Sequence, residues 1–229
     1  MLLSLPLAAL LIAHAFTATG DLFTQDLERA KADAVASDRN LLLDFTGSDW
    51  CIWCQRLDSE VFQGEPFAQQ VTQQFVPVTL DYPRDTSRVP EEFRARNEEL
   101  RQQYGIRGYP TIILADAAGR PFAATGYREG GPEAYLKHLD ELLQHKQLRD
   151  AAFARADEAT GLARARLLDA ALMTLEPGFL TPFYDDVIAE IVRLDADDEA
   201  GLASRYRLRG DAALAARIRA GIDGGGSQH

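Results

Sequence analysis

The sequence predicts an α/β domain with a central mixed sheet flanked by helices, followed by an all-helical C-terminal appendage. Four short apolar runs have strand character: 41–45, 75–80, 111–114 and 121–125. Four segments predicted to be helices lie before, between and after these strands: 24–37, from Cys51 toward Phe62, 91–104 and 132–146. Beyond residue 148 strand patterns are nearly absent, and residues 149–223 are rich in Ala, Leu and Arg.

Composition excludes several classes of protein. The chain has 229 residues, of which 46% are hydrophobic, which is typical of a soluble globular protein with one or two domains. Its 24 Lys+Arg against 35 Asp+Glu give a net charge of −11, which argues against nucleic acid as a partner. Two cysteines are too few for a disulfide scaffold or an all-cysteine zinc site.

Two of the strands can be placed within the sheet. Residues 41–45 (LLLDF) are almost continuously apolar, which predicts a strand buried on both faces and central in the sheet. Pro77 lies in the run 75–80 and cannot donate to a ladder, so this strand is expected at an edge or an end. Residues 82–90, with two prolines, are predicted to be a polar insertion.

The N-terminus has the features of an export signal. Met1 to Ala15 carry no charged side chain, are mostly Leu and Ala, and are too short to span a bilayer. The run ends in Ala13-His14-Ala15, which fits a signal-peptidase site, although no Lys or Arg precedes it. We expect a cleaved signal peptide at 1–15; an uncleaved anchor or a misassigned start are the alternatives.

The remainder divides into a domain over 21–148, a helical domain over 149–223 and a disordered tail over 224–229. Within the helical domain, Ala156 to Leu172 resembles Ala196 to Leu214 at a period near 40 residues. Such a period is typical of stacked helical hairpins, while chance similarity between Ala-rich helices is the alternative.

The two cysteines form a Cys-x-x-Cys motif at Cys51 and Cys54. At the start of a helix this spacing allows one disulfide, and the positive helix terminus stabilises a thiolate on the first cysteine. The motif could instead be half of a zinc site, but no second cysteine pair or histidine cluster follows. A structural disulfide would close only a short loop and stabilise little. Redox chemistry without metal or cofactor is therefore the favoured interpretation.

Residues 24–146 resemble the thioredoxin fold. The match rests on LLLDFTGSDWCIWC (41–54), on YGIRGYPT (104–111), and on the glycines Gly119 and Gly126. The loop 46–50 looks closest to exported bacterial thioredoxin-like proteins and to the soluble catalytic domains of membrane thiol:disulfide interchange reductases. The resemblance covers just over half of the chain and implies a thiol–disulfide oxidoreductase.

The resemblance also implies residue roles. Cys51 would be the nucleophile and Cys54 the resolving thiol. Pro110 would be the family's cis-proline, with Tyr109 touching the active site and the adjacent backbone offering an edge to an extended substrate. Asp44 resembles the buried acid that relays protons, with its pKa raised by burial. The loop before Cys51 is one residue longer than in thioredoxin, which leaves open whether Asp44 lies under the second cysteine.

Other residues near the motif have two interpretations. Trp50 could be a packing lid over the thiols or a substrate contact. Trp53 is expected to be partly exposed, and could dock substrate there. Asp49 could cap the following helix. Asp44 could be a plain structural acid.

Two functional hypotheses follow. The first is an exported, periplasmic oxidoreductase that exchanges disulfides with protein substrates through Cys51 and Cys54, more as a reductant than an oxidant. It requires dithiol or disulfide substrates and an upstream thiol partner, but no nucleic acid, metal or stable membrane insertion. The second is an adaptor or chaperone-like module in which residues 149–223 carry the role and redox activity is secondary.

Overall fold

The computed structural model describes residues 22–210. Its elements follow in the order α1 (Leu27–Ser37), β1 (Asn40–Thr46), α2 (Ile52–Leu57), the π-helix η1 (Asp58–Phe62), α3 (Glu65–Gln74), β2 (Phe75–Asp81), the 3₁₀-helix η2 (Thr86–Arg88), α4 (Glu91–Gln103), β3 (Thr111–Ala115), β4 (Pro121–Thr125), α5 (Gly131–Asp157), α6 (Gly161–Leu172), α7 (Pro177–Phe183) and α8 (Asp185–Leu194). Residues 202–210 form one more helical segment. The predicted signal peptide and tail lie outside the described residues.

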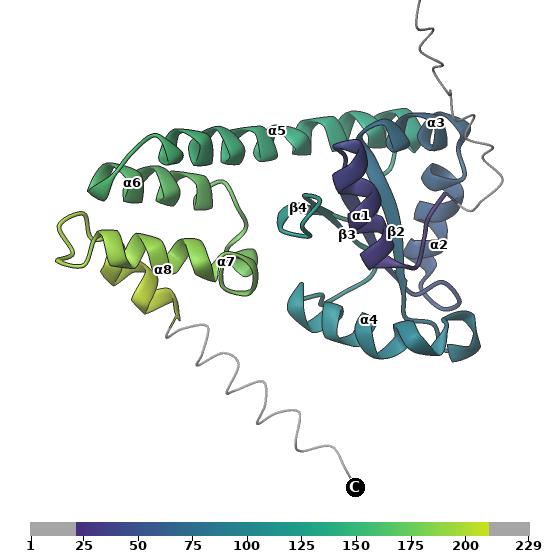
Figure 1. Ribbon diagram of the computed structural model, residues 1–229. Helices are drawn as coiled ribbons and strands as arrows, with labels where there is room; N and C mark the ends of the chain where they lie inside the picture. The colour runs from purple at the N-terminus through teal and green to yellow at the C-terminus, as the bar shows by residue number, and fades with distance from the viewer. Residues whose placement is uncertain (1–21, 211–229) are drawn as a thin grey trace, which may run out of the picture.

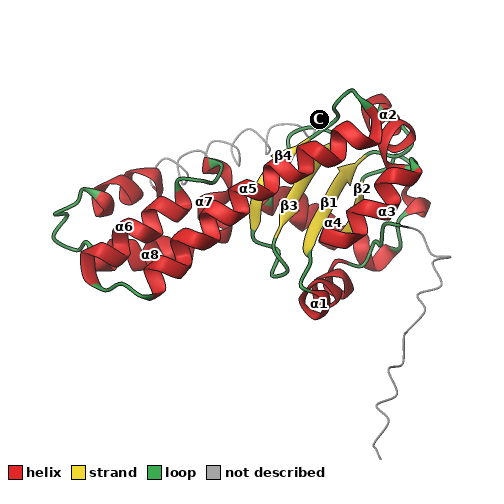
Figure 2. Ribbon diagram, turned by 90° about the horizontal axis from the view of Figure 1, so that it is seen from above, coloured by secondary structure: helices red, strands yellow, loops and turns green. Residues whose placement is uncertain are grey.

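The sheet has the order β2-β1-β3-β4 (Figure 2). Strand β1 pairs parallel with β2 and antiparallel with β3, and β3 pairs antiparallel with β4. The predicted mixed sheet and the central position of β1 are thus confirmed. Pro77 lies in the outer strand β2, as expected, and its carbonyl accepts a hydrogen bond of 3.1 Å from the Thr24 N–H.

Side chains of the sheet alternate between two buried clusters. Leu41, Leu43 and Phe45 pack with α1 and the end of α4. Leu42 belongs to the opposite cluster, which contains residues of α2, η1, α3 and α5. By alternation Asp44 also faces this second side, toward the helix that carries the cysteines.

Two helices differ from the sequence predictions. Residues 65–74 form α3, which the predictions lacked, because only Phe67 and Val71 supply buried apolar spacing in a segment rich in Gln. Helix α5 continues to Asp157 rather than ending near Lys146, and so passes through the expected boundary at 148 (Figure 1). The missing break has a physical reason: Arg149 is buried and donates to the Tyr184 hydroxyl at 2.8 Å, so the helix stays packed against the appendage beyond residue 148.

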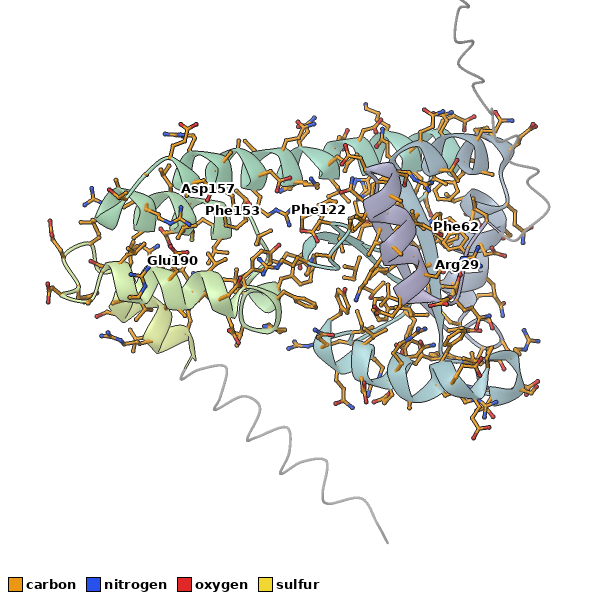
Figure 3. The ribbon with its side chains drawn as sticks, viewed as in Figure 1. Arg29, Phe62, Phe122, Phe153, Asp157 and Glu190 are labelled. Atoms are coloured by element: carbon orange, nitrogen blue, oxygen red, sulfur yellow. A yellow bond between two sulfur atoms is a disulfide. The ribbon has the colours of Figure 1, made fainter. Side chains whose placement is uncertain are left out.

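Helices α6 to α8 pack beneath the extended part of α5 and dock on the edge strand β4. The Tyr184 hydroxyl donates to the Pro121 carbonyl at 2.9 Å. The Phe153 ring on α5 stacks on the Tyr184 ring with centroids 6.5 Å apart, near Phe122 of β4 (Figure 3). Pro121 pairs with Ala115 at the end of β3 that lies beside the start of β1, so docking occurs away from the carboxyl end of β1.

The two segments compared in the repeat hypothesis share one local feature. Gly161 and Gly201 have φ of 55° and 69°, a conformation that favours glycine, and each stands at the start of a helical segment. Common ancestry of the segments stays a prediction. Among residues 22–210, no helix has the length and apolar character needed to cross a membrane.

Candidate redox active site

The cysteine pair begins a helix directly after the central strand. After β1, residues 47–50, here called the redox loop, bring Cys51 to the N-cap of α2. The Cys54 N–H points back at the Cys51 sulfur, 3.2 Å away. The two residues form a disulfide with a Cα–Cα distance of 5.3 Å, within the usual range. Because the backbone N–H is aimed at the first sulfur, a thiolate formed there meets a ready donor.

The disulfide itself is almost covered, while its surroundings are open. Cys51 is 6% exposed and Cys54 4%. Trp50, Ile52 and Trp53 are large apolar side chains exposed beside it. Exposed apolar groups around a reactive pair are a typical contact surface for a protein substrate.

The peptide bond between Tyr109 and Pro110 is cis, as the resemblance implies. The Tyr109 ring lies edge-on to the Trp50 ring at 5.6 Å, so the proline segment and the redox loop meet. A Cβ on Gly126 would come within 3.0 Å of the Pro110 carbonyl oxygen, which explains the small residue after β4. The structure therefore brings Tyr109 and Pro110 to the same end of the sheet as the cysteines.

Trp50 is held in place at the rim. Its indole Nε1 donates to the Tyr82 carbonyl at 2.8 Å. The same ring covers Gly47, where an added Cβ would approach within 2.5 Å of the indole. The indole remains 39% exposed. Trp50 is thus a fixed packing element that also presents surface for contact, which accommodates both sequence interpretations.

Asp49 does not cap the helix, which corrects the sequence prediction; Cys51 occupies the cap. The Asp49 carboxylate instead accepts hydrogen bonds from the backbone N–H groups of Arg84, at 2.9 Å, and Asp85, at 2.8 Å. These bonds, from Asp85 first and then Arg84, hold the pKa of Asp49 below its usual range. The polar insertion that follows β2 is in this way tied to the redox loop.

Trp53 belongs to a cluster that the sequence analysis missed. Its ring, 49% exposed, lies 5.3 Å from the Tyr127 ring. The Arg56 guanidinium lies 5.1 Å from the Trp53 ring centre and 4.8 Å from that of Tyr127. Glu60 accepts from Arg56 at 2.7 Å and from the Tyr127 hydroxyl at 2.5 Å. Only the i, i+4 spacing of Arg56 and Glu60 could have been detected beforehand.

Asp44 is buried under α2, here called the redox helix. It is 7% exposed, and its Oδ1 has no hydrogen-bond partner. Burial first, then the carboxylates of Asp81 and Asp58, raise the pKa of Asp44 to about 8. The side chain therefore carries a proton at neutral pH in the disulfide form.

Asp58 and Asp81 were also missed. Asp58 follows Cys54 by four residues, one helical turn, and could have been found by that spacing. Asp81 ends the strand β2 and is buried, so a charged residue closing an apolar strand was the available indication. Neither carboxylate, nor that of Asp44, forms an ion pair within residues 22–210.

Comparison with known proteins identifies the family to which this domain belongs. Residues 27–143 match the family model of the thioredoxin-like domain. The chain is 33% identical over 122 residues to the disulfide bond reductase DsbH of Chlamydia pneumoniae, covering 53% of this chain and 70% of that protein. It is 30% identical over 151 residues to the thioredoxin-related protein DsbJ of the same organism, covering 63% of this chain but only 43% of DsbJ.

A solved structure of a DsbH oxidoreductase aligns with a TM-score of 0.51 and 30% identity, covering 55% of this chain and 86% of that one. The thioredoxin fold expected from the motifs is confirmed. The matched family region ends at residue 143, about halfway along α5, and does not include the appendage. With its paired cysteines at the start of the redox helix, the chain belongs to the thioredoxin-like family and is a thiol–disulfide oxidoreductase.

Proposed function

We propose that the protein is a reductant of disulfide bonds in exported proteins, with Cys51 as nucleophile and Cys54 as resolving thiol. The observation that carries this proposal is the disulfide at the start of α2, above a buried carboxyl group that has no cationic partner among the described residues. No cofactor is needed for the chemistry, because the dithiol itself holds the two electrons.

In the substrate step the Cys51 thiolate attacks one sulfur of the substrate disulfide. A mixed disulfide forms, and the other substrate sulfur leaves as a thiolate. Cys54 then loses its proton and attacks the Cys51 sulfur, which releases the second substrate thiolate. Two electrons have passed to the substrate, and Cys51–Cys54 is again a disulfide. An upstream dithiol reverses these steps to restore the reduced protein.

Asp44 supplies and takes the proton of the buried cysteine in this scheme. In the disulfide form it is protonated at neutral pH, because its pKa is about 8. When the upstream thiolate opens the disulfide, Asp44 gives that proton to the leaving Cys54 sulfur. The resulting carboxylate is then the base that takes the Cys54 proton during substrate reduction.

Electrostatics favours the reducing direction. A strongly oxidising pair requires a stabilised thiolate in the reduced protein. Here Asp44, Asp58 and Asp81 face the redox helix or belong to it, and negative charge there opposes thiolate formation. The N-terminal end of α2 acts in the opposite sense at Cys51, so the carboxyl groups bear mainly on the second sulfur. The relative named a disulfide bond reductase supports the same direction.

Substrates are proposed to dock as extended segments beside Pro110. The exposed rings of Trp50 and Trp53 stand on the surface beside the disulfide, and Tyr109 contacts the first of them. Apolar side chains flanking a substrate cysteine would bury this surface, and backbone pairing at the proline segment would orient the sulfur for attack.

Capture of mixed disulfides tests this function. A Cys54→Ser variant keeps the nucleophile but cannot resolve, so substrates should remain covalently attached through Cys51 and be identified by mass spectrometry. Cys51→Ser is the matched control and should capture none. If both variants yield the same proteins, disulfide exchange is not the activity.

The redox state of the pair in cells tests the direction of electron flow. If the protein is a reductant, Cys51 and Cys54 should be mostly thiols, as measured by alkylation. A fully oxidised pair would contradict the reducing direction.

Export is proposed from the apolar run at 1–15, which lies outside the described residues. A redox protein of this kind has substrates where disulfides form and persist. A mature N-terminus near Phe16 in the periplasmic fraction is the expected result. An intact Met1 in the cytosol would contradict it.

A further inference from the structure

Asp81 connects the redox loop to the buried layer beneath the cysteines. Its two carboxylate oxygens accept hydrogen bonds from one residue of the loop: Ser48 N–H at 2.9 Å and the Ser48 hydroxyl at 2.6 Å. The Ser48 carbonyl in turn accepts from the Gln55 side chain at 3.1 Å, one turn into the redox helix. The carboxylate thereby fixes the loop that delivers Cys51.

The same side chain faces Asp44. Val76, Val78 and Leu80 pack on the α1 side of the sheet, so by alternation Asp81 lies on the side of the redox helix. In the parallel register Asp44 pairs with Thr79, and Asp81 pairs with Thr46, which places the two carboxyl groups diagonally on neighbouring strands. At such spacing in a buried layer, one negative charge strongly opposes another.

We propose that Asp81 is a positioning residue for disulfide exchange, which holds the redox loop through Ser48 and lies diagonally across from the Asp44 carboxyl group beneath the cysteines. This inference rests on the proposed proton transfer by Asp44. It assigns to Asp81 two linked effects: the geometry of the loop that ends at Cys51, and the retention of the proton that Cys54 receives when the disulfide opens.

The groups that surround Asp44 are consistent with this role. Asp81 is the second largest cause of its raised pKa, after burial and before Asp58. The titratable groups that act on Asp44 from the elements packed against it are Asp81 on β2, Asp58 on η1 and Tyr135 on α5. The two cysteines lie at α2, and β3 places the neutral Ile112 opposite Asp44. Within residues 22–210 neither Asp44 nor Asp81 forms an ion pair, so no counter-charge neutralises the Asp81 carboxylate there.

The test separates charge from hydrogen bonding. Asp81→Asn removes the charge but retains an oxygen that accepts from the Ser48 N–H. The Asp44 carboxyl carbon is followed by NMR in the oxidised, ¹³C-labelled protein, its resonance assigned with Asp44→Asn. We expect a titration midpoint near pH 8 in the wild type, and a midpoint lower by on the order of one pH unit in Asp81→Asn. The pH profile of disulfide opening by dithiothreitol should differ from wild type over the same interval.

Three further variants make the result specific. Asp33→Asn removes the same charge from an exposed site on α1, on the other side of the sheet, and should leave the midpoint unchanged. Ser48→Ala removes one hydrogen bond but keeps the charge, so it should change the rate of opening more than the midpoint. Asp81→Ser removes the charge with a smaller side chain, and provides the same measurement if Asp81→Asn does not fold.

An unchanged Asp44 midpoint in a folded Asp81 variant would overturn this inference, with the exchange function intact. If the wild type shows no Asp44 midpoint near pH 8, or if Asp44→Asn keeps full exchange activity at every pH, the proton role of Asp44 is instead refuted. The two failures are therefore distinguishable.

Discussion

Each of two regions of the molecule, the redox end and the surface where the appendage docks, contains a buried ionisable side chain. The side chain at the docking surface is fully paired, whereas the one at the redox end lacks a partner among the described residues. At the docking surface Arg149 has a side chain only 4% exposed, yet it is fully engaged: it pairs with Asp116 at 3.3 Å and Asp150 at 2.7 Å. It also donates to the Tyr184 hydroxyl at 2.8 Å. At the redox end Asp44 is buried with an unpartnered oxygen and two further carboxylates nearby.

A buried charge that is paired on all sides holds two elements together, and nothing in its surroundings favours proton exchange. A buried carboxyl group without a partner destabilises the fold when ionised, and is retained where its proton is used. The contrast indicates that α6 to α8, with the C-terminal half of α5, form a structural extension, while the chemistry takes place at the carboxyl end of β1.

Replacing Cys51 gives the largest expected effect. Cys51→Ser should abolish disulfide exchange, since Cys51 is the proposed nucleophile at the N-cap of α2, whereas Cys54 lies within the helix. Reduction of insulin by dithiothreitol with catalytic protein measures this, with Ser59→Ala, on the exposed side of η1, as a control of unchanged activity. Substantial turnover by Cys51→Ser would mean that the assigned nucleophile is wrong.

Asp44→Asn should change stability strongly and in a pH-dependent way. The folded protein keeps the Asp44 proton up to about pH 8, whereas the unfolded chain releases it near 3.8. Stability is therefore complete below about pH 4 and is lost as pH rises toward 8, by on the order of 4 kcal/mol at pH 7.

The variant lacks this loss. In urea titrations of the oxidised protein, the free energy of unfolding of Asp44→Asn should therefore increase relative to that of wild type from pH 4 to pH 8. Asp33→Asn should run parallel to wild type. A constant difference in free energy of unfolding between Asp44→Asn and wild type across this interval would show that Asp44 is not buried as a neutral acid.

Arg149→Leu should weaken the docking surface while sparing the redox end. Its removal takes the cationic partner from Asp116 and Asp150 and one of two hydrogen bonds from the Tyr184 hydroxyl. We expect a cost of on the order of 2 kcal/mol, because both carboxylates are partly exposed. Hydrogen exchange should increase in α7 and α8, with disulfide exchange unchanged. Arg155→Leu, exposed on the same helix, is the control. A loss of redox activity in Arg149→Leu would show that the two regions are coupled.

Trp50→Phe has the smallest predicted effect. It loses the hydrogen bond from the indole to the Tyr82 carbonyl, worth about 1 kcal/mol of stability. Trp53 makes no such bond among the described residues, so Trp53→Phe should cost less in the same urea titration. Equal losses would mean that the indole bond does not hold the rim of the site.

Much of the redox domain could be predicted from local patterns. The continuous apolar run of β1, Pro77 in β2 and the cysteine spacing each have a direct physical meaning, and the cis bond at Pro110 followed from resemblance. Helix α3 could not be found, since its inward face consists of only two apolar residues.

The supporting residues of the site escaped for a different reason. Asp81 reaches Ser48 across 33 positions, and Tyr127 reaches Glu60 across 67, so only the folded chain brings them together. The boundary at 148 was drawn where composition changes, but Arg149 has its partners in the fold rather than in its own sequence neighbourhood, and α5 continues past it.

The reduction potential of the Cys51–Cys54 pair is the most direct test of the account. Equilibration of the purified protein with glutathione at pH 7, read by alkylation and mass, gives the value. Because the buried Asp44 beneath the redox helix is accompanied by the carboxylates of Asp81 and Asp58, we expect a potential of about −270 mV or lower, in the range of reductants. A value near about −120 mV, that of a strong oxidant, would contradict both the direction and the electrostatic argument that supports it.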